Sequence, residues 1–255
     1  MNRDSLISQV MAKIRTSLKP IAIAITRFLV PNSLQRLEQQ QHQLRDWAQL
    51  SVYQPTKATI APPIIEEHRV IFFGDSITEF WDLAADFPEK PYINRGISGQ
   101  TTSQMLIRFR PDVIVLQPKA VLILGGTNDI AGNPGPMTLE MITNNYASMA
   151  ELARANSTQV IFASVLPVHD YGKVKQSAFR SPTQIKALNN WLIRYCTEQQ
   201  HIYLDYYSAL SDASANLDAK LSDDGVHPNT QGYKKMASLA SNAIDQALDS
   251  VSNST

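Results

Sequence analysis

The sequence has one cysteine, no net charge and no long apolar run, and each shortage excludes a class of protein. Cys196 alone can form neither an internal disulfide nor a cysteine-based zinc site. The 23 basic and 23 acidic residues balance, which removes the general electrostatic argument for a nucleic-acid partner. No stretch approaches the roughly 18 uninterrupted apolar residues of a confident membrane span.

The remaining composition is that of a folded protein with one sizeable core. Of 255 residues, 44% are apolar and 18% are charged, so the chain is not wholly disordered. A change of pattern near residue 70 predicts an N-terminal helical extension with a linker, 1–69, and a main domain, 70–249. We expect the last residues, 250–255, to form a disordered tail.

The first 30 residues predict a basic amphipathic helix, which Pro20 should kink or break. They hold five basic residues and one acidic residue. Such a helix can lie on an anionic membrane surface, or it can pack on the protein's own core or on a partner. The apolar positions recur every three or four residues, at Ile7, Met11, Ile14, Leu18, Ile21, Ile25 and Phe28.

A secretory signal is an alternative reading of the same region. The apolar run at 21–30 is short, is split by Arg27 and lacks a clear small-residue cleavage site. We therefore expect a cytoplasmic or membrane-peripheral protein rather than a secreted or periplasmic one.

A second helix is expected at 34–50, followed by a proline-containing linker at 51–68 that wraps onto the main domain. The buried stripe of this helix would comprise Leu34, Leu37, Leu44 and Trp47.

From residue 70 onward, apolar runs and amphipathic segments alternate. The runs predict buried strands at 70–73, 92–94, 120–124, 159–163 and 202–205. The amphipathic segments predict helices at 102–109, 139–156, 183–200 and 230–248. This alternation implies an α/β fold of three layers, with helices on both faces of a parallel sheet. In such sheets ligands bind beyond the carboxyl ends of the strands.

Four polar, glycine-bearing segments fall at that expected edge. Three of them, at 74–78, 96–101 and 125–129, follow the first three strands, and the fourth, at 223–229, precedes the last helix. Each segment alone is compatible with ordinary turn or capping chemistry. Four of them at one edge indicate a functional site.

The four segments contain the groups that acyl transfer needs. The Ser76 hydroxyl is a weak nucleophile unless a base such as a neutral His227 removes its proton. Asp224 can bind the other imidazole nitrogen and fix the tautomer. The charge that develops on an attacked carbonyl needs preplaced donors. We expect these donors to be the backbone N–H groups of Ser76 and Gly99 and the side-chain amide of Asn128.

At these residues the chain resembles the SGNH hydrolases, also called the GDSL esterase/lipase family, over residues 70–248. The four signature segments occur in the family's order as Gly-Asp-Ser, the Gly99 segment, Gly-Thr-Asn-Asp and Asp-Gly-Val-His. The resemblance implies a five-stranded parallel flavodoxin-like sheet. It also implies that Ser76 is the nucleophile, Gly99 and Asn128 are oxyanion donors, and Asp224 and His227 complete a catalytic triad. Isoleucine replaces the leucine that usually follows Gly-Asp-Ser, a volume-conserving change.

The segment 94–102 resembles the branch related to platelet-activating-factor acetylhydrolase catalytic subunits and lysophospholipase-like bacterial esterases. The expected function is hydrolysis of a small-molecule ester, with a short acyl chain, through an acyl-enzyme and without cofactor or metal. The same chemistry leaves a carbohydrate O-acetylesterase, a thioesterase or a lysophospholipase open. A glycan- or lipid-binding module without activity is a further alternative, although binding alone needs no activated nucleophile.

Other polar residues at this edge are expected to have lesser roles. Asp75 and Asp129 should hold turn backbones by local hydrogen bonds, and Asp223 should be solvated. His169, after the fourth strand, is either a loop histidine or a substrate contact. Cys196 should be buried within a helix without a catalytic role. The glycine- and proline-containing loop 131–137 could order over the substrate or form a rigid connection.

Overall fold

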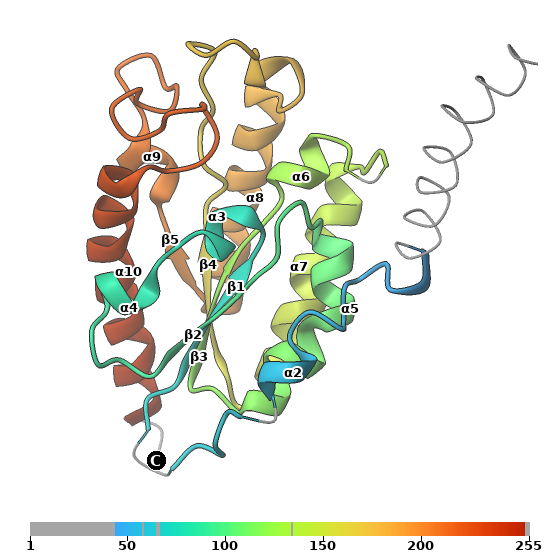
Figure 1. Cartoon of the computed structure of the whole chain (residues 1–255), viewed down its shortest axis with the longest axis vertical. Helices are drawn as coiled ribbons and strands as arrows, with labels where there is room; N and C mark the ends of the chain where they lie inside the picture. Colours follow the sequence, from blue (N-terminus) through green and yellow to red (C-terminus); the bar gives the residue numbers. More distant parts are fainter. Residues whose placement is uncertain (1–43, 58, 65–66, 134, 253–255) are drawn as a thin grey trace, which may run out of the picture. The chain divides into compact units, whose positions relative to one another are not determined.

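The computed structural model describes residues 44–57, 59–64, 67–133 and 135–252 (Figure 1). The predicted helix in residues 1–30 and most of the predicted helix 34–50 lie outside these ranges. Among residues 44–50, which the structure does describe, 44 and 45 are helical and the chain then turns up to a left-handed Gln49 at φ 56°. Leu44 and Trp47 are 78% and 38% exposed, so the predicted burial of these two residues is wrong.

The main domain is built on five parallel strands, as predicted. They are β1 (Val70–Gly74), β2 (Tyr92–Gly96), β3 (Ala120–Leu124), β4 (Gln159–Ala163) and β5 (Ile202–Leu204). Their order in the sheet is β2-β1-β3-β4-β5, the flavodoxin-like arrangement. The chain reverses its direction of winding at β1, so the segments that follow β1, β2 and β3 meet at one edge.

Helices cover both faces of the sheet and complete the three layers (Figure 1). Successive residues of β1 point to opposite cores: Ile71 and Phe73 lie in one cluster, and Val70 and Phe72 lie in the other. The first cluster is covered by α5 (Thr102–Asp112), α7 (Leu139–Arg154) and α8 (Pro182–Gln199). The second is covered by α4 (Leu83–Asp86), α9 (Tyr206–Leu210) and α10 (Thr230–Ser252).

Short helices occupy the connections. They are α2 (Gln54–Lys57), α3 (Ser76–Glu79), η1 (Ile114–Leu116), α6 (Thr127–Ile130) and η2 (Gln176–Ala178). At the C-terminal end, α10 continues through Ser252 and so enters the segment predicted as a tail.

The compact unit that contains the sheet begins at Leu50, before the predicted boundary at residue 70. Specific contacts hold the intervening linker in place. The Tyr53 hydroxyl donates to the Gly96 carbonyl at the end of β2, and its ring lies 4.3 Å from the guanidinium carbon of Arg95. Arg69 donates to the Ala61 carbonyl at 2.9 Å. The linker therefore packs on the domain through side chains that composition alone does not mark.

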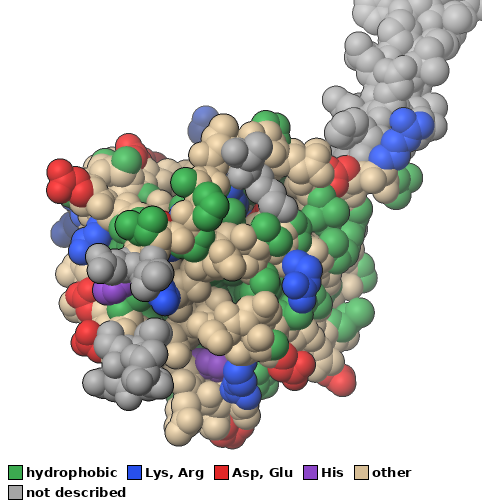
Figure 2. All heavy atoms as spheres, turned by 90° about the horizontal axis from the view of Figure 1, so that it is seen from below, with side chains coloured by type: hydrophobic (Ala, Val, Ile, Leu, Met, Phe, Trp, Pro, Cys, Tyr) green, Lys and Arg blue, Asp and Glu red, His purple; other side chains and the backbone are tan. Residues whose placement is uncertain are grey.

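Charges of both signs are interspersed on the face of the molecule that Figure 2 shows. Among the described residues, no helix is long and apolar enough to span a membrane.

Candidate active site

Ser76 lies at the start of α3, immediately beyond the carboxyl end of β1. The Asp75 carboxylate caps this helix by accepting from the Ile77 N–H at 3.0 Å. Gly74 is required because a Cβ there would lie 2.4 Å from the Leu124 carbonyl oxygen. The backbone at Gly74 therefore runs close against the end of β3, and Ser76, two residues later, is buried at 8% exposure.

The structure brings Ser76, His227 and Asp224 into one hydrogen-bonded row. Ser76 Oγ lies 2.9 Å from His227 Nε2, and His227 Nδ1 lies 2.6 Å from Asp224 Oδ2. An ionised carboxylate only accepts hydrogen bonds, so Nδ1 carries the proton when the ring is neutral. Nε2 is then free to accept the Ser76 hydroxyl proton. Residues 151 positions apart in the chain meet at this contact.

The Asp224 carboxylate is held ionised by its own loop. Its partial burial would raise the pKa, but donors from His227 and Val226 outweigh burial and lower the pKa to about 2. The backbone N–H groups of His227 and Val226 donate to Oδ1 at 2.8 and 2.9 Å. Oδ2 is thereby left for the imidazole.

His169 packs against the loop that carries Asp224 and His227. It is 4% exposed, and its backbone N–H donates to the Gly225 carbonyl at 3.1 Å. Its Nδ1 accepts from the Tyr171 N–H at 3.1 Å. Gly225 adopts φ 85°, and a Cβ there would lie 2.4 Å from the His169 carbonyl oxygen. His169 is thus a buried loop histidine against the Asp224–His227 segment.

The three expected oxyanion donors come from the segments that follow β1, β2 and β3. Within the described ranges, the backbone N–H groups of Ser76 and Gly99 have no hydrogen-bond partner. Gly99 adopts φ 77° and faces open space. Asn128 Nδ2 donates to the Gln100 carbonyl at 3.1 Å and has a long contact of 3.4 Å to Asp75 Oδ2. The Asn128 amide is thus held by the segments that follow β1 and β2.

Two buried carboxyls behind the site join its segments. Burial raises the pKa of both Asp75 and Asp129 to about 6, against the hydrogen bonds they accept. Asp75 accepts from the local Ile77 N–H, as predicted, and has the longer contact with Asn128, whereas Asp129 accepts from the N–H of Thr102, on α5. The expectation of a purely local role is therefore wrong for Asp129, because its carboxyl ties the segment after β3 to the segment after β2.

Several residues near the site were not singled out from the sequence. The Phe80 ring, 58% exposed, lies 5.4 Å from the His227 ring. Gln176 connects the site to the β4–α8 loop, because its amide donates to the Asp224 carbonyl at 3.1 Å and accepts from Arg180 at 3.0 Å. Phe80 follows the Ser76 helix directly, and this proximity in sequence is the one signal that could have pointed to it.

Other predicted features keep a structural role. Asp223 is exposed, and Cys196 is buried in α8. Among the residues that the structure describes, no group of three His, Cys, Asp or Glu side chains could hold a metal ion.

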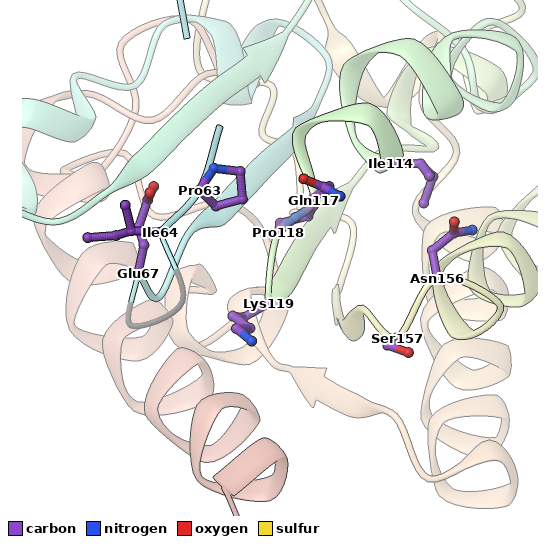
Figure 3. A pocket seen from close by; sticks show the side chains of 9 residues that line it. All are labelled: Pro63, Ile64, Glu67, Ile114, Gln117, Pro118, Lys119, Asn156 and Ser157. Atoms are coloured by element: carbon purple, nitrogen blue, oxygen red, sulfur yellow. The ribbon is translucent and has the colours of Figure 1, made fainter. Parts of the chain in front are cut away.

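Two cavities are lined by residues other than Ser76, His227 and Asp224. One of about 380 Å³ opens at the opposite, amino-terminal edge of the sheet (Figure 3), where Lys119 precedes β3 and Glu67 precedes β1. The other, of about 40 Å³, lies beside α6, the helix that carries Asn128. It is lined by Ile130, Met137, Leu139, Ile142, Gln184 and Ala187.

A sequence model of the GDSL-like Lipase/Acylhydrolase family matches residues 72–235, which include all four signature segments. The chain belongs to this family. The resemblance seen in the sequence is thus confirmed, together with the α/β fold that it implies.

Similar proteins agree with membership of the GDSL-like family. A Bacteroides fragilis protein described as a candidate acylhydrolase is 40% identical, with a TM-score of 0.75 over 80% of this chain and 99% of that one. A Streptococcus pneumonia protein described as a candidate platelet activating factor is 24% identical, with a TM-score of 0.70 over 84% and 99%, and shares the fold. The uncharacterized lipoprotein YqeF of Bacillus subtilis is 26% identical over 62% of this chain and 71% of its own length.

Proposed function

We propose that the protein is a serine esterase that hydrolyses carboxylic esters through an acyl-enzyme. The observation that carries the proposal is the row from Ser76 Oγ through His227 to the ionised Asp224, with contacts of 2.9 and 2.6 Å. An imidazole held in this way can accept the serine proton on one side while the carboxylate stabilises the resulting imidazolium on the other.

The proposed reaction has two balanced halves. Ser76 Oγ attacks the acyl carbonyl as its proton passes to His227 Nε2, and the oxyanion takes hydrogen bonds from Ser76, Gly99 and Asn128. The tetrahedral species collapses as the alcohol leaves with the proton from His227. Water then attacks the acyl-enzyme with His227 as base, and the acid is released with Ser76 restored.

The test is turnover of p-nitrophenyl acetate by Ser76→Ala. We expect loss of at least about 10³-fold in kcat, because the nucleophile is absent. Ser208→Ala, which removes an exposed serine from α9, is the matched control and should keep wild-type activity. Undiminished hydrolysis by a folded Ser76→Ala protein would reject the mechanism.

We propose short acyl chains as the substrates. The cavity of about 40 Å³ supports this, since it adjoins α6, the helix that carries the proposed donor Asn128, and has space for about three water-sized groups. Ala187→Leu would fill it, and we expect this change to lower kcat/KM for the butyrate ester more than for the acetate ester. Equal effects on both esters would separate the cavity from acyl binding. The same panel, extended to acetylated sugars, thioesters and lysophospholipids, distinguishes the alternative substrates.

We further propose that residues 1–30 bring the enzyme to a membrane surface. Their five basic residues and amphipathic spacing support this, and the similarity to a lipoprotein agrees with it. Full-length protein should co-sediment with anionic liposomes, and Lys13→Glu with Arg15→Glu and Lys19→Glu should release it. The control changes Lys186, Lys234 and Lys235, exposed on α8 and α10, to Glu. Equal binding by both triple variants would contradict the proposal.

A further inference from the structure

We infer that Arg108 is a positioning residue that holds the three oxyanion donors in register, an inference that rests on the proposed esterase function. Arg108 lies on α5, behind the site, and its side chain is fully buried. It is the largest of the fully buried side chains among the described residues. No substrate can reach it, so any effect on the reaction must pass through its neighbours.

The guanidinium contacts the ends of two strands and the turn that follows the second. Nη2 donates to the Gly74 carbonyl at 2.7 Å, and Nη1 donates to the Arg95 carbonyl at 2.8 Å. Nε donates to the Gln100 side-chain oxygen. One planar group therefore joins the carboxyl ends of β1 and β2 to the Gly99–Gln100 turn.

Two of these contacts lie within two residues of an oxyanion donor. Gly74 precedes Ser76 by two positions, and Gln100 directly follows Gly99. Gln100 also accepts, through its backbone carbonyl, the Asn128 amide hydrogen at 3.1 Å. A shift of Arg108 would consequently move all three donors. Arg108 makes no direct contact with the side chains of Ser76, His227 and Asp224.

The chemistry of the contact requires arginine rather than another cation. Three acceptors in different directions are satisfied by a rigid fork of N–H donors, which an ammonium group on a flexible stem cannot reproduce. The Phe73 ring, 4.2 Å from the guanidinium carbon, and Asp112, at 3.2 Å from Nη1, complete its surroundings. Burial lowers the pKa of Arg108 only to about 10, so the group stays protonated at neutral pH.

The experiment compares Arg108→Lys with Arg69→Lys. Arg69 is a matched control because it is also buried, at 4% exposure, and donates to the backbone carbonyls of Leu116 and Ala61 at 2.9 Å each. It precedes β1 and so lies at the opposite end of the strand that leads to Ser76. Both variants keep the positive charge and lose the planar set of guanidinium donors, but only Arg108 contacts the segments that carry the oxyanion donors.

We expect Arg108→Lys to lower kcat at least about tenfold, with KM within twofold and the pH profile of kcat unchanged. Affinity for an alkylboronic acid, which forms a tetrahedral adduct on the serine, should fall by the same factor as kcat. Arg69→Lys should lower the melting temperature while kcat and boronate affinity stay within twofold of wild type. If Arg108→Lys does not fold, Gln100→Leu removes the Nε acceptor and should give the same pattern.

The test variant is Arg108→Lys, or Gln100→Leu in its place. If its folded form has the same kcat as Arg69→Lys, the positioning role is overturned and the esterase proposal stays intact. A loss of kcat without a matching loss of boronate affinity would also overturn it, because donors out of register must weaken binding of the adduct. Wild-type protein without Ser76-dependent turnover would instead reject the esterase proposal on which the inference rests.

Discussion

At the residue scale, the charge of Asp224 is the property on which the proposed base depends. Asp224→Asn keeps the shape of the side chain but presents an amide that can donate to Nδ1 and favour the wrong tautomer of His227. We expect kcat to fall at least about 100-fold, measured on p-nitrophenyl acetate at neutral pH.

Asp223→Asn is the matched control for this substitution, since Asp223 is exposed and adjacent in the chain. It should keep wild-type kcat. Comparable losses in both variants would show that the loop tolerates no change of charge and would remove the specific role of Asp224.

Asp129 gives a prediction for the pH dependence of stability. Its pKa rises from 3.8 to about 6 on folding, so the folded state holds more protons than the unfolded state between these values. The free energy of unfolding must therefore decrease as pH rises through this window. Relative to Asp129→Asn, which does not titrate, wild-type protein should lose up to about 3 kcal/mol between pH 4 and pH 7.

Urea denaturation of both proteins at pH 4, 5, 6 and 7 measures this difference. Asp75 has a similarly raised pKa and is present in both proteins, so the part of its contribution that comes from burial cancels. The part that comes from the charge of Asp129 is lost in Asp129→Asn and changes the difference in the same direction. A difference that stays constant over this range would contradict the burial of a titrating carboxyl at position 129.

At the scale of the element, the segment that carries Asp224 and His227 depends on a glycine. Gly225 has a backbone φ of 85°, which alanine rarely adopts, and the Cβ of Gly225→Ala would lie 2.4 Å from the His169 carbonyl oxygen. We expect destabilisation by about 1–2 kcal/mol and a loss of kcat of at least about tenfold, because the segment must shift. Thermal unfolding and ester turnover measure the two effects.

Gly172→Ala is the control, because it lies in the neighbouring β4–α8 loop and its Cβ would meet only the Asp224 carbonyl oxygen, at 4.0 Å. It should leave both quantities near wild type. A Gly225→Ala protein with normal activity would show that the close approach to His169 is not needed.

The elements also show what the sequence could and could not predict. The strand at 120–124 and the start of the helix at Leu139 were predictable because apolar periodicity records burial directly. The buried position of Arg108 was not predictable, since a charged residue within an amphipathic helix is ordinarily solvated. Its acceptors lie on two strands and a turn, away from its own helix. Contacts of Tyr53 with Gly96 and of His169 with Gly225 were equally invisible, because nothing local in the sequence records a partner 43 or more residues away.

At the scale of the whole molecule, the strand order explains why distant segments make one site. With β1 between β2 and β3, the segments holding Ser76, Gly99 and Asn128 must emerge side by side at the carboxyl edge. Two of the motifs were therefore sufficient to predict that Ser76, His227 and Asp224 meet. The strand bounds alone could not predict the cavities, since these depend on loop conformation and side-chain packing.

Activation of the Ser76 hydroxyl underlies every step of the proposed reaction, and covalent labelling with a fluorophosphonate measures that activation. Intact mass and peptide mapping of the treated, folded protein should locate a single adduct on Ser76. His227→Ala should slow labelling by at least about 100-fold, because the hydroxyl then keeps its proton. Failure of the folded wild-type protein to react, or an adduct at any other residue, would contradict the account.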